Sequence, residues 1–232
     1  LFDFDKQVYD EENTVEIHEF IRSDKKFSTM EDLKAAMLED ERNVKKFFKG
    51  SPEDHPDVAT VILNYNGKKY LERFLPFFNT SRYPNEKQYV VDNASTDGSV
   101  KFVKTTFPNI ECITLETNKG YAGGYNEALA KIDSKYYAIV NSDIEITPQW
   151  LVPIIQMMEK DETIAAVQPK ILAEQRRGYF EYAGAAGGFM DSLGYPFCRG
   201  RILNNIERDT GQYDTDVPIF WASGAALVIR RD

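Results

Sequence analysis

The sequence has little cysteine and little histidine. Its 232 residues contain two of each, Cys112, Cys198, His18 and His55, spread widely along the chain. A disulfide framework needs several paired cysteines, and a structural zinc site needs a local group of Cys and His. The sequence therefore predicts neither feature, and it fits a reducing cytoplasm.

Long apolar runs and an excess of positive charge are also lacking. No uninterrupted run approaches the roughly 18 apolar residues of a transmembrane helix, and the first residues are acidic, unlike a signal peptide. The 28 Lys and Arg against 37 Asp and Glu give a net charge of −9. Nucleic-acid-binding proteins present a basic face, so this balance argues against a nucleic-acid partner. We expect a cytoplasmic protein without a transmembrane segment, which in its full-length form could be peripheral to the inner membrane.

A change in composition near residue 50 predicts a domain boundary. The segment FKGSPEDHPDV (48–58) places Gly50, Pro52 and Pro56 among charged residues, which is typical of a linker. We predict an amino-terminal part over 1–49, a linker over 50–57 and a main domain over 58–232. With 42% hydrophobic residues, the chain can bury a full core.

The main domain alternates short apolar runs with helix-like stretches. The runs lie at 58–64, 88–93, 110–115, 136–141 and 164–169. Candidate helices lie at 68–79, 97–106, 122–132 and 148–160, the last with Thr147 and Pro148 as a predicted start. The apolar runs are almost unbroken, which favours strands covered on both faces. This order predicts a doubly wound α/β layer with a mostly parallel sheet.

Polar residues gather where three of these strands end. In such a sheet, ligands bind beyond the carboxyl ends of the strands. The polar ends are NYNG (64–67), VDNASTDGS (91–99) and NSDIE (141–145). An aromatic ring, hydrogen-bonding groups and a carboxylate that can hold a cation are what a nucleoside diphosphate requires.

A glycine-rich turn, NKGYAGGYNEAL (118–129), follows the third strand. It is neither GxGxxG nor GxxxxGK[ST], and it does not follow the first strand, which argues against a Rossmann dehydrogenase and a P-loop enzyme. A nucleotidyltransferase is a further alternative. It would need a basic, glycine-rich loop after the first strand, where the sequence supplies only Gly67, Lys68 and Lys69.

Five motifs occur in the order and spacing found in family 2 glycosyltransferases. They are VILNYNG (61–67), VVDNASTDGS (90–99), NKGYAGGYN (118–126), VNSDIE (140–145) and FWASGAALVIRRD (220–232). From about residue 58 the chain resembles this family, and most of all its bacterial rhamnosyltransferase-type branch. The resemblance implies a GT-A fold, in which a Rossmann-like sheet is flanked by helices. It also implies a metal-dependent, inverting transfer of a sugar from a nucleotide diphosphate donor to an acceptor hydroxyl.

The resemblance also implies roles for individual residues. Asp143 matches the metal-binding last position of an Asp-x-Asp-like motif, with Mg²⁺ or Mn²⁺ as the cation, and Asn141 keeps an acceptor at the first position. Tyr65 is expected to stack on a pyrimidine, and the Asn93 carbonyl to accept its N3–H, which favours UDP or dTDP. The implied substrate-binding residues are Asn64, Tyr65, Asn66, Asp92, Asn93, Asn118, Gly120, Asn126, Asn141, Trp221 and Gly224, with Ser223 beside them.

Some of the polar and aromatic residues also suit purely structural roles. Asn64, Asn66 and Asp92 could cap loops and helices, and Asp97 suits a turn and a helix start. For Glu145, exposure to solvent and contact with the metal are both left open. The other structural expectations are packing for Tyr121 and Tyr125, a core position for Trp150 and an exposed loop acid for Asp191.

The general base that the family uses is expected after Asp232. A base must lie within hydrogen-bond reach of the acceptor hydroxyl. We therefore expect residues 58–232 to be the donor-binding part of an enzyme of cell-surface polysaccharide synthesis, with a saccharide or lipid-linked acceptor. The alternative from another class is a nucleotide-sugar-binding module without turnover.

The amino-terminal part resembles the last third of a bacterial riboflavin kinase module. The resemblance rests on LFDFD, VEIHEFIR and KFSTMEDLKAAM. We predict two strands and a helix, a small α+β appendage, with a capping box from Ser28 to Glu31. The catalytic glutamate and the flavin and ATP loops of that family precede this stretch, so no flavokinase activity is expected.

Overall fold

A computed structural model describes residues 26–27, 29–49, 55–182 and 184–231. It divides into two compact units, Leu1–His55 and Pro56–Asp232. The first unit contains helix α1 (Met30–Lys49), with Glu31 and Asp32 in its first turn. The Thr29 hydroxyl accepts the N–H of Asp32 at 3.1 Å, which satisfies an otherwise unpaired donor.

The helix start therefore differs from the predicted capping box by one residue. Thr29 makes the capping hydrogen bond, and its spacing of three residues to Asp32 is the same as the predicted spacing from Ser28 to Glu31. Ser28 and the two strands predicted before α1 lie outside the described residues.

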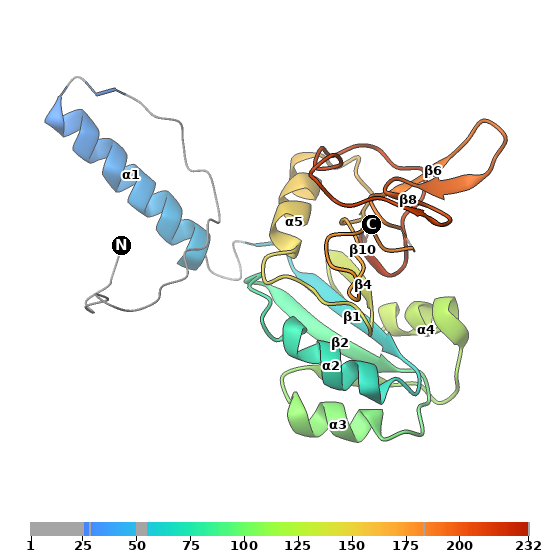
Figure 1. Ribbon diagram of the computed structural model, residues 1–232. Coiled ribbons are helices and arrows are strands. Elements are labelled where there is room, and N and C mark those ends of the chain that lie inside the picture. Colours follow the sequence, from blue (N-terminus) through green and yellow to red (C-terminus); the bar gives the residue numbers. More distant parts are fainter. Residues whose placement is uncertain (1–25, 28, 50–54, 183, 232) are drawn as a thin grey trace, which may run out of the picture. The chain divides into compact units, whose positions relative to one another are not determined.

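The second unit repeats strand and helix in the predicted order (Figure 1). Its first eight elements are β1 (Val58–Asn64), α2 (Lys68–Phe78), β2 (Glu86–Asp92), α3 (Ser99–Thr106), β3 (Glu111–Thr114), α4 (Gly120–Leu129), β4 (Tyr136–Asn141) and α5 (Leu151–Lys160). The six-stranded sheet has the order β3-β2-β1-β4-β10-β5. β1 pairs in parallel with both β2 and β4, which confirms the α/β layer and the mostly parallel sheet.

Both faces of the central strand are buried. Val58 and Ile62 of β1 belong to a core cluster with residues of α2, α3 and α5, whereas Ala59 and Val61 belong to a second cluster with residues of α4. Figure 1 shows α2 and α3 together on one side of the strands and α4 apart from them. Burial on both faces explains why these strands read as apolar runs without alternation.

The last strand of the six-stranded sheet along the chain was not predicted. β10 (Ala226–Arg230) runs antiparallel to β4, with Ala226 opposite Val140. Of the run predicted over 164–169, only β5 (Ala166–Val167) is a strand, and it pairs with β10. The segment ALVIR has the apolar composition of a strand, but its direction depends on a chain reversal that is not a local property.

A second, four-stranded antiparallel sheet was also not predicted. It contains β6 (Gly188–Met190), β7 (Pro196–Cys198), β8 (Arg201–Ile202) and β9 (Asn205–Ile206), in chain order. Strands of two or three residues are too short to show a period in the sequence. Asp191 lies exposed in the β6–β7 turn, where its carboxylate accepts the N–H groups of Leu193 and Tyr195 at 2.8 and 2.9 Å, which confirms the reading as a loop acid.

The predicted start of α5 is wrong by three residues. The helix begins at Leu151, with Trp150 at its N-cap and no side-chain cap. The Thr147 carbonyl accepts the N–H of Trp150 at 3.2 Å and so closes a turn. The Pro148 carbonyl accepts the N–H of Arg82 at 2.7 Å. Trp150 is buried in the core, as predicted, so tertiary packing and not the local cap sets this helix start.

One acid joins the starts of two helices. The Asp97 carboxylate accepts the N–H of Lys68, the first residue of α2, at 2.8 Å and the N–H of Ser99, the first residue of α3, at 3.0 Å. This confirms its reading as a turn and helix-start residue. Partial burial would raise its pKa, but hydrogen bonds from the Ser99 side chain and from these two N–H groups outweigh it and lower the pKa of Asp97.

None of the helices in the described part of the chain is long and apolar enough to span a lipid bilayer.

The first prediction concerns β10. Val228 is fully buried against the main core, so Val228→Ala should lower the free energy of unfolding by about 2 kcal/mol, from lost burial and a residual cavity. Urea denaturation followed by tryptophan fluorescence measures this loss. Val217→Ala, at a side chain that is 39% exposed, serves as the control with little change. Equal stability of both variants would show that β10 is not packed into the sheet.

The second prediction concerns pH. Because the pKa of Asp97 is lower in the folded than in the unfolded chain, the unfolded chain binds more protons in acid. The stabilisation is complete above the ordinary value of 3.8 and is lost as the pH falls through the folded pKa. We expect Asp97→Asn to be less stable than wild type at pH 7. This difference in stability should disappear as the pH falls below the folded pKa of Asp97, which is lower than 3.8. Urea midpoints over a pH series test this, with Asp216→Asn as the control that should follow wild type throughout.

Candidate functional site

The register of the sheet brings three polar strand ends to one edge. Asn64 of β1 lies opposite Asp92 of β2, and Leu63 lies opposite Asn141 of β4. The Asn64 side-chain NH₂ donates to the Asp92 carboxylate at 3.1 Å. Parallel strands that end level with one another place their following loops side by side, so the loops after β1, β2 and β4 begin at the same edge.

Asn64 and Asp92 form the buried base of this edge. Each is 1% exposed. The Ser95 hydroxyl accepts a second hydrogen bond from Asn64 at 3.1 Å, and the Ser95 N–H donates to Asp92 at 2.8 Å. These bonds hold the loop after β2 in place, which is the capping role considered for both residues. Their predicted contact with substrate stays a prediction.

Asn66 connects the first two loops. It adopts a left-handed backbone conformation with φ of 49°, which Asn tolerates better than most residues. Its backbone N–H donates to the Ser95 hydroxyl at 2.9 Å, and its side-chain oxygen accepts the Thr96 N–H at 2.8 Å. Tyr65, between two anchored residues, is 54% exposed. The loop thus presents an aromatic ring on a fixed backbone.

Asn93 anchors the glycine-rich turn. Its NH₂ donates to the Asn118 side-chain oxygen and to the Gly120 carbonyl, both at 3.0 Å, and its oxygen accepts the Lys119 N–H at 2.9 Å. Gly120 has φ of 69°, a region that favours glycine. An amide oxygen has two lone pairs, so the predicted bond to a pyrimidine N3–H would use the second one. Asn118 and Asn126 are exposed.

Asp143 differs from its neighbouring acids. Asp92 and Asp97 accept hydrogen bonds within their loops, and Glu145 pairs with Arg177 at 2.7 Å. Within the described part of the chain, the exposed Asp143 carboxylate has no hydrogen bond or ion pair. Glu116, which follows β3, is exposed as well. It lies three strands from β4 in the sheet order, a spacing of about 14 Å.

Arg177 was not identified from the sequence. It pairs with Glu145 across 32 positions of the chain, and the dipeptide Arg176–Arg177 before Gly178 carries no local signal beyond a turn. The ion pair gives Glu145 one partner within the chain, and its contact with solvent or with a metal stays a prediction. Glu145 faces a cation of the chain itself.

Gly224 lies beside the end of β4. The Tyr121 hydroxyl donates to the Gly224 carbonyl at 2.5 Å, and the Asn141 N–H donates to the next carbonyl, that of Ala225, at 2.9 Å. The rings of Tyr121 and Tyr125 meet edge to face at 4.9 Å. Tyr125 is buried, which confirms packing, whereas Tyr121 is half exposed and joins α4 to the segment before β10.

Trp221 packs against the second sheet, where it forms an isolated β-bridge with Gly188. Its indole N–H donates to the Phe189 carbonyl at 3.1 Å, and its ring fills the space that a Cβ on Gly188 would need. The Ser223 N–H donates to the Gln168 side-chain oxygen at 2.6 Å. Of the predicted site residues, Trp221 is therefore engaged in packing, and its contact with sugar or acceptor stays a prediction.

The residues that could hold a divalent cation are few. Among the described residues, no three His, Cys, Asp or Glu side chains are grouped so that they could hold a metal ion by themselves. Mg²⁺ is often held by one or two carboxylates together with substrate phosphates and water. One unpaired carboxylate at a strand end suits that mode of binding and does not suit a closed protein cage.

Each of the two parts of the sequence is similar to known proteins. Residues 1–48 match the family model described as riboflavin kinase. A glycosyltransferase of Haemophilus influenzae without assigned function is 25% identical over 50% of this chain and 36% of its own length. The teichoic acid poly(glycerol phosphate) polymerase of Staphylococcus epidermidis is 28% identical over 38% of this chain and 13% of its own. The chain thus spans about a third or less of these relatives.

A solved structure and a second family model complete the comparison. S. aureus TarS (1–349) in complex with UDP-GlcNAc is 24% identical, with a TM-score of 0.47, over 52% of this chain and 36% of that one. Residues 60–225 match the family model described as glycosyl transferase family 2. Since this match covers well over half of the chain, the chain belongs to glycosyl transferase family 2, and its second unit has the GT-A fold.

Proposed function

We propose that the second unit binds a nucleotide-diphospho-sugar at the carboxyl edge of its sheet and that it serves in the inverting transfer of the sugar to an acceptor hydroxyl. Membership of the family supports sugar transfer. The relative named as a teichoic acid poly(glycerol phosphate) polymerase supports a role in cell-surface polymer synthesis. The observation that carries the proposal is the unpaired carboxylate of Asp143 at the end of β4.

Asp143 would hold Mg²⁺ or Mn²⁺ together with the diphosphate of the donor. Its neighbours Asp92, Asp97 and Glu145 are all engaged by groups of the chain, so Asp143 is the acid of this group that is free to bind a cation. When bound, the cation would offset the negative charge on the departing nucleoside diphosphate.

The remaining roles fall to groups that face outward. The exposed ring of Tyr65 offers a stacking surface for a pyrimidine, and the exposed amides of Asn118 and Asn126 offer donors and acceptors to the ribose. The hydrogen bonds of Asn66 and Asn93 fix the backbone on either side. Because these loops are already ordered by the chain itself, little conformational entropy would be lost on binding UDP or dTDP.

A second candidate function is nucleotide-sugar binding without turnover. Transfer needs a general base within reach of the acceptor hydroxyl. Of the acids in the described strand ends and loops of β2 and β4, Asp92, Asp97 and Glu145 are engaged and Asp143 is assigned to the cation, which supports this alternative. Release of UDP from a UDP-sugar in the presence of an acceptor distinguishes the two functions.

The third prediction tests the cation site. In calorimetric titrations of UDP and dTDP, we expect Mn²⁺-dependent binding to wild type. Asp143→Ala should weaken it at least about tenfold, because a charged ligand of the cation is worth more than 1.4 kcal/mol. EDTA should have the same effect. The matched control is Glu116→Ala, which removes an exposed acid at the same edge. Binding that ignores both the metal and Asp143 would contradict the proposal.

The fourth prediction tests the stacking surface. Stacking of a base on an aromatic side chain contributes roughly 1–3 kcal/mol, so Tyr65→Ala should weaken binding of UDP by about fivefold to 150-fold. Tyr65→Phe keeps the ring and should bind like wild type. The same titrations measure both variants. If the Phe variant were as weak as the Ala variant, the hydroxyl and not the ring would make the contact.

A further inference from the structure

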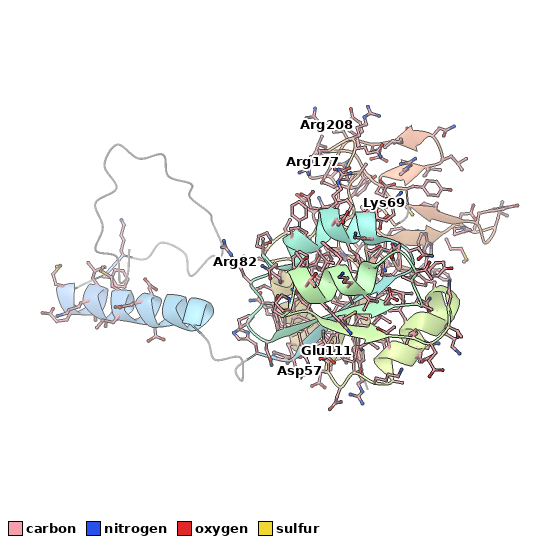
Figure 2. The ribbon with its side chains drawn as sticks, turned by 90° about the horizontal axis from the view of Figure 1, so that it is seen from below. Asp57, Lys69, Arg82, Glu111, Arg177 and Arg208 are labelled. Carbon is pink, nitrogen blue, oxygen red and sulfur yellow. The ribbon has the colours of Figure 1, made fainter. Side chains whose placement is uncertain are left out.

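A group of exposed basic side chains lies near the loop that carries Asp143. It consists of Lys69 and Arg73 on α2, Arg176 and Arg177 in the segment 173–178, and Arg208. These five residues are called the basic surface below. Figure 2 shows Lys69, Arg177 and Arg208 on one side of the second unit, with Glu111 and Asp57 on the opposite side.

Contacts between the elements make this surface continuous. Arg73 forms an ion pair with Glu174, which joins α2 to the segment 173–178. Lys69 lies one helical turn before Arg73, and residues four apart share a helix face. The Arg176 guanidinium stacks on the Tyr179 ring at 3.5 Å.

Arg208 and Arg177 extend the surface in two directions. Arg208 forms a β-bridge with Tyr179, on which Arg176 stacks. Arg177 pairs with Glu145, two residues after Asp143. The basic surface therefore reaches the loop of the candidate cation site.

The charge of this surface opposes that of the whole chain. Two of its five cations pair with acids, Arg73 with Glu174 and Arg177 with Glu145. Lys69, Arg176 and Arg208 form no ion pair with any residue in the described ranges. Of the acids that flank it, Asp209 and Asp214 are both held by Lys170, at 2.7 and 2.5 Å, and Glu72 pairs with Lys68 at 3.5 Å. A local positive excess on a chain of net charge −9 concentrates anions at this one face.

We propose that the basic surface binds a polyanionic acceptor, a polymer whose repeating units carry phosphodiester groups, and that it guides the end of that polymer to the sugar donor. This proposal rests on the proposed function, since it names the acceptor for the same site. Four of the five cations are arginines, whose planar guanidinium groups match phosphate oxygens in pairs. Their spread over three chain segments suits an extended ligand with repeated charges better than a single anion.

The neighbouring aromatic side chains favour a polyol or saccharide polymer over an isolated lipid headgroup. Lys69 lies over the ring of Tyr70 at 4.7 Å, and Tyr70 is 40% exposed. Alternating cations and ring faces can contact charged groups and apolar C–H faces along one chain. The ion pair of Arg177 with Glu145 then connects the bound polymer to the loop of Asp143.

The test is binding of the whole 232-residue chain to poly(glycerol phosphate), measured by biolayer interferometry. The test variant combines Lys69→Gln, Arg176→Gln and Arg208→Gln, which removes the three cations without an ion pair. We expect at least a tenfold loss of affinity for the polymer, while calorimetric binding of UDP with Mn²⁺ is unchanged. Affinity of wild type should fall with rising salt, because exposed charges are screened.

A matched control separates this surface from general charge. Lys101→Gln, Lys104→Gln and Lys160→Gln together remove three exposed cations from α3 and α5 and should leave polymer affinity unchanged. Dextran, a neutral polymer, should not bind. Equal loss of affinity in both triple variants, or no loss in the test variant, would overturn the proposal.

Binding of the chain to anionic phospholipid vesicles is measured in the same way. If vesicles bind through the same three residues and the polymer does not bind, the surface is a membrane contact and the proposal is wrong. The UDP titration distinguishes a failure of the polymer-binding proposal from a failure of the proposed donor site. A wild-type chain that binds the polymer through these residues but binds no nucleotide would contradict the proposed donor site and leave the polymer-binding surface in place.

Discussion

Burial of β1 on both faces is the constraint on which the rest of the second unit depends. Val61 and Ile62 are fully buried, one toward each layer of helices. A strand packed on both faces is held in its register, because its side chains are fitted at close packing between two layers of helices. The observed register places Asn64 level with Asp92 and next to the end of β4. The polar edge is thus a consequence of the apolar core.

From this edge the chain divides its polar groups into two kinds. The side chains of Asp92, Asn93 and Asp97 accept hydrogen bonds from loop N–H groups, and the Asn64 NH₂ donates to Asp92. Their hydrogen bonds order the loops, since a buried polar group without partners would be costly. The second kind, with Asp143 as its clearest member, remains exposed and available. Because the hydrogen-bonded residues hold the loops in place, the exposed residues lie in a fixed arrangement.

Charge connects this edge to the surface around it. The ion pair of Glu145 with Arg177 keeps the second acid of the NSDIE segment engaged and leaves Asp143 as the unpaired one. The same arginine belongs to a basic surface on an otherwise acidic chain. An exposed ion pair of this kind contributes little to stability, at most about 1 kcal/mol. Its importance for function is that it leaves the Asp143 carboxylate unpaired, at an edge that borders the basic surface.

Local sequence patterns determined much of the fold. The unbroken apolar runs at 58–64 and 136–141 predicted β1 and β4 to the residue, because burial on both faces leaves a signal in consecutive residues. The resemblance to family 2 glycosyltransferases and to riboflavin kinase is confirmed by the family models. The domain limits and the substrate roles of individual residues stay predictions.

Only the tertiary structure decided the rest, since it depends on contacts between distant parts of the chain. The antiparallel direction of β10 depends on a chain reversal after the second sheet, and the start of α5 depends on the packing of Trp150. The engagement of Asp92, Asp97 and Glu145, which singles out Asp143, involves partners up to 32 residues away. A sequence shows which side chains could bind a cation. The folded structure shows which of these side chains already form hydrogen bonds or ion pairs with other groups of the chain.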